Sequence, residues 1–444
     1  MALMPKLSRK SKFLILLLDW LLYLVALLVM SHFRLGSIES IEWISVGPGL
    51  MLLSIFIFNY IFSNYDVDSH RGRQILLNSF YAVSSHLFLF ISIVYMFGID
   101  RSDLYGRGML FGAAFGYFLS AAWARLLIRR LFKKNVDRVN WIILCDSQIE
   151  KLIQQDQMHS QLRGQFRQIN VLENQNPLSL SDLSNSVLVV AAPAASMSSQ
   201  WKSYLLDKKM KGEAVMTWAD FVEKSLRKIP VSHIESDWLV FTSGYSILQE
   251  GWLIRAKRMS DLFLAVFVLL LSWPFVLLTA LAVKLESRGP ALYSQKRTGF
   301  RGRHFTIYKF RSMRIDAEAQ GPQWAAQKDP RVTRVGAFIR KTRLDELPQL
   351  YNVIIGDMSF IGPRPERPEF NLDLEKQIPF YNLRNAVRPG LTGWAQIMYP
   401  YGASVEDAQR KLEYDLYYIK NYSIILDILI LLKTVKIVLF GKGR

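Results

Sequence analysis

Two adjacent carboxylates, Asp345 and Glu346, are the residues of this chain best suited to chemistry. They lie in a strongly basic region, and the cations around them are Lys309, Arg311, Arg314, Arg331, Arg334, Arg340, Lys341, Arg343, Arg364, Arg367 and Arg388. A carboxylate can attack phosphorus to form an acyl phosphate, and phosphoryl transfer needs positive charge around the phosphoryl oxygens. The pair therefore predicts chemistry on a bound phosphate ester. The alternative is a solvated helix start, where acidic residues favour the helix dipole.

The composition indicates an anionic partner and a membrane. The 444 residues carry a formal net charge of +18, and 51% of them are hydrophobic. Such a charge fits nucleic acid, anionic lipid or phosphorylated substrates. Because the charge lies beside apolar segments, lipid and phosphate are favoured and no nucleic-acid partner is expected. The single cysteine, Cys145, excludes an intramolecular disulfide and a cysteine metal cluster.

Residues 1–135 are expected to form a transmembrane domain of four helical spans. Apolar runs of about the length that crosses a bilayer occupy residues 13–30, 41–62, 80–97 and 109–128. Basic residues precede the first run, lie between the second and third, and follow the fourth. The positive-inside rule therefore places the N-terminus and everything after residue 130 in the cytoplasm. Small residues along the fourth run, such as Gly112 and Ala113, predict close helix packing.

Residues 136–250 are expected to form a small cytoplasmic, Rossmann-like α/β domain. Short β-rich runs alternate with helical segments such as 148–159 and 198–211, which is typical of a parallel sheet. The four β-rich runs are 139–145, 168–172, 187–192 and 214–218. No G-x-G-x-x-G turn follows the first strand, and without those glycines a pyrophosphate cannot approach the backbone closely. We therefore interpret this domain as structural or regulatory.

An apolar run within residues 258–284 is interrupted by Ser272 and Pro274. A proline in mid-helix removes a backbone hydrogen bond and bends the helix, so a kinked spanning helix is one interpretation. Basic residues flank the run on both sides, however, and a complete crossing would place the following basic region outside the cell, against the positive-inside rule. A re-entrant helix that breaks at Ser272 and Pro274 and returns to the cytoplasmic side satisfies both flanks.

The remaining C-terminal segments are expected to form an α/β arrangement. Residues 305–310 alternate like a strand, and residues 333–341 and 344–355 are predicted to be helical. The last apolar segment, residues 424–440, contains acidic and basic side chains. These charges favour an amphipathic helix in the membrane interface, with a buried core helix as the alternative.

An ordered set of short motifs covers the C-terminal part of the chain. The motifs are Lys257-Arg258-x-x-Asp261, Gln295-Lys296-Arg297-x-Gly299, Phe305-Thr306-Ile307-Tyr308-Lys309-Phe310-Arg311-Ser312-Met313, Asp329-Pro330-Arg331-Val332-Thr333, Asp345-Glu346-Leu347-Pro348-Gln349, Gly356-Asp357-Met358-Ser359, Gly362-Pro363-Arg364-Pro365 and Arg388-Pro389-Gly390-Leu391-Thr392-Gly393-Trp394. Each is weak alone, but their order and spacing are specific. The set resembles the bacterial sugar transferases, polyprenyl-phosphate hexose-1-phosphate transferases that start capsule, exopolysaccharide or O-antigen synthesis. The four spans and the central α/β domain resemble the large membrane subclass of that family.

The resemblance implies that residues 251–444 form the catalytic domain, on the cytoplasmic face of the bacterial inner membrane. A UDP-sugar would give its sugar-1-phosphate to undecaprenyl phosphate, and UMP would leave. Glucose or galactose is the expected sugar, because long members of the family commonly use them. By motif position, Asp345 would be the nucleophile that forms a phospho-sugar enzyme, and Glu346 would help to hold Mg²⁺.

The resemblance also implies which cations hold phosphate. Arg364 matches the proline-flanked arginine of the family and suits a bidentate phosphate grip. Further candidates for binding the pyrophosphate or the lipid phosphate are Lys309, Arg311, Arg297, Arg340 and Arg388. Two alternatives stay open: a glycosyltransferase that would release UDP, and a non-catalytic scaffold of a polysaccharide assembly complex. A homodimer through the spans or the α/β domain is a further hypothesis.

Overall fold

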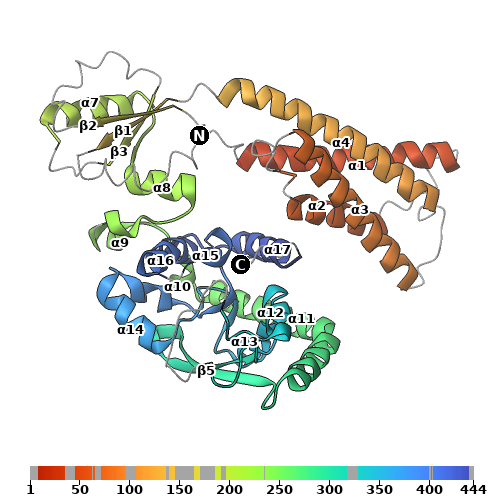
Figure 1. Cartoon of the computed structure of the whole chain (residues 1–444). Coiled ribbons are helices and arrows are strands. Elements are labelled where there is room, and N and C mark those ends of the chain that lie inside the picture. The colour runs from red at the N-terminus through yellow and green to blue at the C-terminus, as the bar shows by residue number, and fades with distance from the viewer. Residues whose placement is uncertain are drawn as a thin grey trace. The chain divides into compact units, whose positions relative to one another are not determined.

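The computed structural model describes residues 9–35, 46–62, 64–65, 72–96, 107–136, 140–145, 165–170, 186–191, 197–234, 236–317, 329–399, 402 and 404–439. The chain divides into two compact units, Met1–Phe221 and Val222–Arg444. Figure 1 labels the helices and strands of both units.

The N-terminal unit begins with four apolar helices: α1 (Arg9–Leu35), α2 (Val46–Ile61), α3 (Gly72–Met96) and α4 (Arg107–Val136). Stretches of 21, 21 and 22 residues in α1, α3 and α4 are long and apolar enough to cross a membrane. Helix α2, with 16 residues, is shorter. The sequence predicted four spans here, and the described residues supply three helices of spanning length and one shorter apolar helix. Helix α3 begins before the predicted residue 80, and its early residues Ile75 and Ser79 are buried.

Small residues on α4 allow α1 to approach it closely. Ala113, Ala114 and Ala121 are buried, and they belong to one hydrophobic cluster with Tyr23 and Leu27 of α1. A side chain added at Gly112 of α4 would collide with Met30 of α1. The predicted small-residue packing face of the fourth helix is therefore confirmed.

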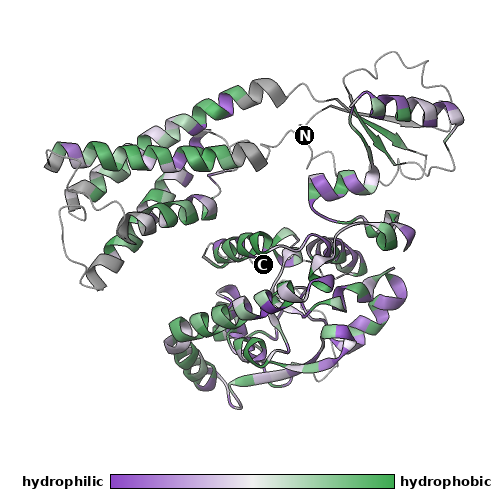
Figure 2. Cartoon of the chain, turned by 180° about the vertical axis from the view of Figure 1, so that it is seen from behind, coloured by the Kyte–Doolittle hydropathy of each residue, from purple (hydrophilic) through white to green (hydrophobic). Residues whose placement is uncertain are grey.

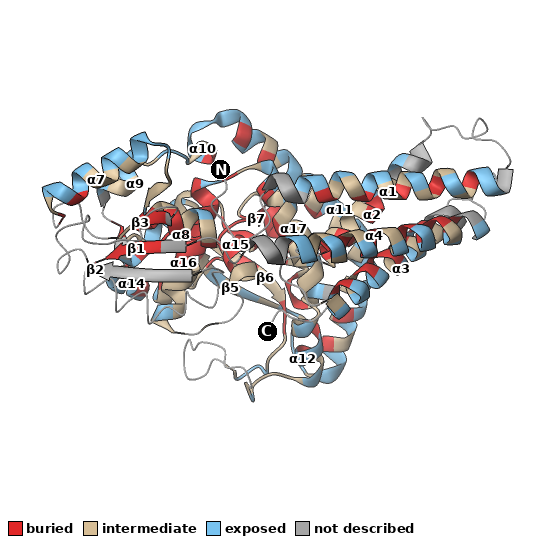
Figure 3. Cartoon of the chain, turned by 90° about the horizontal axis from the view of Figure 1, so that it is seen from above, coloured by how far each residue is buried: buried red, intermediate tan, exposed pale blue. Residues whose placement is uncertain are grey.

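A buried ion pair joins α1 to α4. Arg125 Nη2 donates to the two carboxylate oxygens of Asp19 at 2.8 and 2.7 Å, and both side chains are at most 3% exposed. Asn59 of α2 donates to the hydroxyl of Tyr117 at 2.7 Å, and Arg125 also donates to that hydroxyl at 3.3 Å. Figure 3 shows the buried residues along these helices. Charges inside an apolar bundle are retained when they are paired, so this pair fixes α1 against α4.

A four-stranded parallel sheet follows, with strand order β2-β1-β3-β4. Its strands are β1 (Asn140–Cys145), β2 (Gln165–Asn170), β3 (Ser186–Val190) and β4 (Val215–Thr217). Helix α7 (Ser199–Met210) packs on the sheet through Trp201, which clusters with Ile142 and Leu188, and α8 (Trp218–Leu226) follows β4. The predicted parallel strands are confirmed, whereas the helix predicted at 148–159 lies outside the described residues.

The C-terminal unit combines helices with two small sheets. Its elements are η4 (Val231–His233), α9 (Ser236–Phe241), α10 (Ser246–Gln249), α11 (Gly251–Glu286), β5 (Leu292–Thr298), η5 (Phe300–Gly302), β6 (His304–Phe310), α12 (Arg334–Lys341), η6 (Leu344–Glu346), α13 (Gln349–Ile355), β7 (Ser359–Ile361), α14 (Pro368–Gln377), η7 (Tyr381–Ala386), β8 (Gly390–Thr392), α15 (Trp394–Met398), α16 (Val405–Lys420) and α17 (Ile424–Leu439). Strands β5 and β6 form an antiparallel hairpin, and β7 pairs with β8 in parallel. The mixed α/β character predicted for this region is confirmed.

Residues 222–250 contact α16, although the sequence placed them with the preceding α/β domain. Lys228 forms a buried ion pair with Glu413 at 2.9 Å, and Ile229 N–H donates to the Glu413 carbonyl at 2.9 Å. Tyr245 N–H donates to the carbonyl of Lys420 at 2.9 Å. Long-range pairs of this kind have no local sequence signature, so composition alone did not separate this segment from the sheet.

Helix α11 is continuous from Gly251 to Glu286 and contains Pro274. The sequence predicted a break at Ser272 and Pro274, and that break is absent from the assigned helix, because a proline can bend a helix without ending it. The middle of α11 exposes large apolar side chains such as Leu270 and Leu278, and Figure 2 shows its hydrophobic colouring. Both ends of α11 contact other helices of the C-terminal unit, α13 near its start and α12 at its end. Arg258 donates to the carbonyls of Val353 and Ile354 at 2.6 and 2.7 Å, and the Glu286 carboxylate accepts the N–H of Val335 at 3.0 Å.

Helix α17 has one buried face and one exposed apolar face. Leu426 and Ile430 are buried, whereas Ile425 is 70% exposed. Asp427 of α17 forms an ion pair with Lys257 of α11 at 2.9 Å, so the two apolar helices are joined at this point. The interfacial position predicted for this helix remains a prediction.

The Asp19–Arg125 pair generates a stability prediction. Arg125→Met leaves the Asp19 carboxylate buried without its partner and should lower the free energy of unfolding by about 3–5 kcal/mol. The double variant Asp19→Leu/Arg125→Met removes both charges and should recover most of that loss. Unfolding of the purified protein in detergent measures both effects, with the exposed Arg130→Met of the same helix as control. A double variant as unstable as Arg125→Met would contradict the pairing argument.

Candidate active site

The carboxylate pair lies in η6, a short 3₁₀ turn between α12 and α13. Arg343, directly before the turn, has a φ of 60°, a left-handed conformation that is uncommon for residues with a side chain. The sequence predicted one helix over 344–355. Instead α13 begins at Gln349, because Pro348 has no N–H with which to continue an α-helix from Leu344. Strained backbone of the kind seen at Arg343 concentrates at functional sites.

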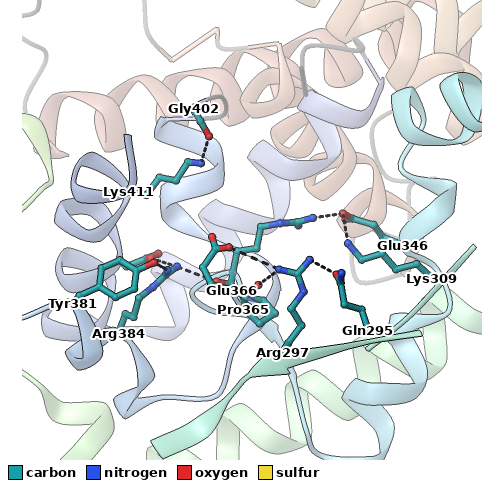
Figure 4. Close-up of polar contacts among 12 residues, drawn as sticks. Gln295, Arg297, Lys309, Glu346, Pro365, Glu366, Tyr381, Arg384, Gly402 and Lys411 are labelled. Atoms are coloured by element: carbon teal, nitrogen blue, oxygen red, sulfur yellow. Dashed lines mark hydrogen bonds and ion pairs between the residues drawn. The ribbon is translucent and has the colours of Figure 1, made fainter. Parts of the chain in front are cut away.

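Glu346 is surrounded by three cations. Its Oε1 accepts a hydrogen bond from Arg364 Nη2 at 2.7 Å, and lies 3.2 Å from Arg343 Nη1 and 3.9 Å from Lys309 Nζ. Figure 4 shows Lys309 beside Glu346. Burial alone would raise the pKa of Glu346, but the charges of Arg364, Arg343 and Lys309 hold that pKa well below its usual range. Glu346 is therefore ionised at neutral pH.

Asp345 has a different environment, although it is the neighbouring residue. Its side chain is buried, and its Oδ1 has no hydrogen-bond partner within the part of the chain that the structure describes. Burial and the negative charge of Glu346 raise the pKa of Asp345 to about 6, against the opposing effects of Lys309 and Arg343. At neutral pH most Asp345 side chains are therefore ionised, and their Oδ1 is a buried acceptor that no described group satisfies.

Lys309 approaches the pair from β6. Asn352 of α13 fixes this strand, because its Nδ2 donates to the Thr306 carbonyl at 2.8 Å and its Oδ1 accepts the Tyr308 N–H at 3.3 Å. Burial and the charge of Arg364 lower the pKa of Lys309 to about 7, against the effect of Glu346. The positive charge of Lys309 thus depends on nearby anions, and a bound phosphate would favour it.

Arg364 lies in the loop between β7 and α14 and is flanked by Pro363 and Pro365. Its side chain is 34% exposed, so the guanidinium meets Glu346 on one side and remains accessible. Arg384 Nη2 donates to the Arg364 carbonyl at 2.9 Å and forms an ion pair with Asp415 at 2.8 Å. The sequence did not predict Arg384 and Asp415 as site residues, since neither belongs to one of the quoted motifs.

The other predicted cations have contacts that differ from those of Lys309 and Arg364. Arg297 donates to Gln295 Oε1 at 2.7 Å and to the Pro365 carbonyl at 3.3 Å, so it holds the Arg364 loop. Arg311 donates to the carbonyl and hydroxyl of Ser287 at 2.8 and 2.9 Å, and this contact fixes the turn after α11.

Arg388 and Arg340 have described neighbours other than the dyad. The Arg388 guanidinium lies 5.9 Å from the centre of the Phe300 ring. A hydrogen bond from Arg331, with a smaller effect from the charge of Arg340, lowers the pKa of Asp329 to about 2. Of the six cations proposed to bind phosphate, the described contacts bring Lys309 and Arg364 to Glu346. They add Arg343, which had been counted only as part of the basic surroundings.

The dyad fits a magnesium ion that takes its other ligands from a bound substrate and water. Within the described ranges, no group of three or more His, Cys, Asp or Glu side chains could hold a metal by itself. Magnesium commonly binds one or two carboxylates and takes its remaining ligands from substrate phosphates and water. Asp345 and Glu346 supply two adjacent carboxylates, and the unpartnered Oδ1 of Asp345 is a suitable oxygen ligand.

Comparison with known proteins places this site in a matched region. A family model described as "Bacterial sugar transferase" matches residues 252–441. UDP-N-acetylgalactosamine-undecaprenyl-phosphate N-acetylgalactosaminephosphotransferase of Aeromonas hydrophila is 45% identical over 251 residues, covering 54% of this chain and 58% of that protein. UDP-glucose:undecaprenyl-phosphate glucose-1-phosphate transferase of Escherichia coli K12 is 45% identical over 181 residues, covering 40% of this chain and 39% of that protein.

A shorter relative matches over nearly its whole length. Exopolysaccharide production protein PSS of Rhizobium leguminosarum bv. phaseoli is 42% identical over 185 residues, which cover 40% of this chain and 92% of that protein. By contrast, the chain spans less than two thirds of the Aeromonas and Escherichia proteins. The similarity to the shorter protein therefore covers that protein almost completely.

The electrostatic coupling within the dyad gives a prediction that does not depend on activity. Glu346→Gln removes the like charge beside Asp345 and leaves the cations, so the pKa of Asp345 should fall by about one unit or more. Carbodiimides react with protonated carboxyl groups, and mass spectrometry can follow modification of Asp345 as a function of pH. The midpoint of Asp345 modification should lie near pH 6 in the wild-type chain and at a lower pH in Glu346→Gln. The exposed Glu369→Gln is the control, and an equal midpoint in all three proteins would refute the coupling.

Proposed function

The chain belongs to the bacterial sugar transferase family, and from this premise we propose that it transfers a sugar-1-phosphate from a UDP-sugar to undecaprenyl phosphate and releases UMP. This reaction would be the initiating step of exopolysaccharide, capsule or O-antigen synthesis. The observation that carries the proposal is the unequal dyad: Glu346 is held by three cations, while its neighbour Asp345 keeps a buried oxygen without a partner.

In the first half-reaction Asp345 acts as the nucleophile. A carboxylate oxygen of Asp345 forms a bond to the β-phosphorus of the donor, and the bond from that phosphorus to the bridging oxygen breaks. The bridging oxygen leaves with its electron pair as part of UMP, and the sugar phosphate stays on the enzyme as an acyl phosphate. Burial supports this role, because a carboxylate with a pKa raised to about 6 is poorly solvated and is still largely ionised at pH 7.

The cations around Glu346 would hold the phosphate groups during this step. Arg364 presents a planar guanidinium that can donate two parallel hydrogen bonds to a phosphate, and its partial exposure leaves it accessible. Lys309 and Arg343 add positive charge from two other elements. Glu346 keeps this group of like charges together in the absence of substrate and remains ionised throughout.

In the second half-reaction the lipid phosphate takes the place of UMP. An oxygen of undecaprenyl phosphate forms a bond to the phosphorus of the acyl phosphate, and the bond to Asp345 breaks. The sugar diphosphate lipid is released, and the Asp345 carboxylate is regenerated. Donor and acceptor can therefore use one set of phosphate-binding cations in turn, as a ping-pong scheme requires.

Magnesium is the proposed cofactor. Asp345 and Glu346 would hold it together with phosphate oxygens of the donor. When bound, the ion would offset the negative charge of the pyrophosphate and of departing UMP. The residues of this chain would keep the ion beside the cations that bind the same phosphates.

The lipid acceptor requires a site at the bilayer surface. Re-entry would need α11 to bend at Pro274 without ending there. Contacts support the proposal that α11 enters the cytoplasmic leaflet and returns: Arg258 near its start and Glu286 at its end both bond to other elements of the C-terminal unit, while the residues between them expose apolar side chains. The protein would thus be a multi-pass protein of the bacterial inner membrane, with its C-terminal unit on the cytoplasmic face.

Release of UMP tests the proposal directly. Membranes containing the protein are given undecaprenyl phosphate, Mg²⁺ and, in turn, UDP-glucose, UDP-galactose and UDP-N-acetylgalactosamine. UMP should appear with one donor, and Asp345→Asn should lower its rate by about 10³-fold or more, because the amide is a poor nucleophile. Asp373→Asn, the same change at an exposed site, should leave the rate unchanged. UDP in place of UMP would indicate a glycosyltransferase, and an active Asp345→Asn would remove Asp345 from its role.

A further inference from the structure

Four successive carbonyls of the Arg364 loop each accept a hydrogen bond from elsewhere in the C-terminal unit. The acceptor and donor pairs are Pro363 O with Gly390 N at 2.8 Å, Arg364 O with Arg384 Nη2 at 2.9 Å, Pro365 O with Arg297 Nη1 at 3.3 Å, and Glu366 O with Thr298 N at 2.9 Å. Two of these donors are arginine side chains, which Figure 4 shows reaching the loop. The loop backbone is therefore fixed from several directions.

Arg384 supplies the contact at the Arg364 carbonyl, and its own guanidinium is fixed in turn. Its Nη2 donates to Asp415 Oδ2 at 2.8 Å and its Nη1 donates to the Tyr381 hydroxyl at 2.6 Å. Arg384 is 5% exposed and Asp415 is 1% exposed. Burial raises the pKa of Asp415 to about 6, although Arg384 opposes the shift. A buried ion pair of this kind costs desolvation energy, and apolar residues could often fill the space with equal stability.

We propose that Arg384, held by Asp415, is a positioning residue for the transfer reaction. By fixing the Arg364 backbone between two prolines, it aims the Arg364 guanidinium at Glu346 and at the bound phosphate. The role rests on the proposed function of Arg364. Arg384 would act through Arg364 and not on the substrate itself, since its described contacts are with Arg364 O, Asp415 and Tyr381.

The geometry of a guanidinium explains why arginine is needed. Its planar fork donates to the Arg364 carbonyl, Asp415 and the Tyr381 hydroxyl at the same time. A lysine keeps the charge that balances Asp415 but has one nitrogen at the end of a flexible chain, so it cannot reproduce the planar arrangement. Arg384→Lys therefore preserves the ion pair and releases the loop. A displacement of about 1 Å in a group that holds the substrate can lower a rate by about 100-fold.

Hydrogen–deuterium exchange tests the loop without using activity. Arg384→Lys should increase exchange at the amides of Gly362, Thr298 and Gly390, whose hydrogen bonds to or from this stretch weaken when the loop is released. Lys376→Ala, at an exposed lysine of α14, should not. Asp415→Asn is the second variant if Arg384→Lys does not fold, because it removes the charge that holds Arg384 and keeps an acceptor of the same shape. Unchanged exchange in the folded variant would overturn the positioning role.

A double-mutant cycle tests how the effect reaches the reaction. Arg384→Lys should lower the rate of UMP release by about 10- to 100-fold, and it should add almost nothing to the loss caused by Arg364→Ala, because it acts through Arg364. Additive losses, or a wild-type rate in Arg384→Lys, would overturn the inference. A wild-type protein that released no UMP from any donor would overturn the proposed function, and the exchange experiment would still decide whether Arg384 fixes the loop.

Discussion

The burial of the Glu346 carboxylate among Arg343, Arg364 and Lys309 is the interaction on which the site depends. A buried carboxylate is costly unless it is paired, and three like charges so close together would repel one another without an anion between them. In this cluster the carboxylate is paired and the cations have an anion between them, and its members come from three elements. A bound phosphate would bring negative charge as Glu346 does, so the arrangement that holds Glu346 would also suit the phosphate-binding site that we propose.

The neighbouring Asp345 gains its distinct character from the same cluster. The cations are bonded to Glu346, and Asp345 is buried beside that negative charge with an unpartnered oxygen. Backbone geometry maintains the different environments of the two carboxylates. Arg343, in a left-handed conformation, and Pro348, which has no N–H, lie at the two ends of a short turn that is not a regular helix. This difference is the basis of the two roles that we propose for adjacent carboxylates, Glu346 as a counter-charge and Asp345 as the nucleophile.

The sequence predicted the dyad, Lys309 and Arg364 because charge density and motif order can be read from the sequence alone. It did not reveal Arg384 and Asp415, which are 31 residues apart and whose pairing depends on the packing of η7 against α16. Arg311 and Arg297 were predicted as phosphate ligands from the family resemblance, yet their hydrogen bonds go to the Ser287 turn and the Arg364 loop. Charge shows that an arginine needs an acceptor, and tertiary structure decides which acceptor it meets. For the same reason the sequence placed residues 222–250 with the sheet, whereas buried pairs such as Lys228–Glu413 join them to α16.

The central claim is that Asp345 carries the sugar phosphate during transfer, and trapping that adduct tests it most directly. The purified protein is incubated with Mg²⁺ and the donor it uses, without undecaprenyl phosphate, then quenched in acid and digested for mass spectrometry. We predict a sugar-phosphate mass increase on the peptide that contains Asp345, lost when the lipid acceptor is added before the quench. A protein that turns over donor and acceptor but never carries this adduct, or carries it on another residue, would contradict the account.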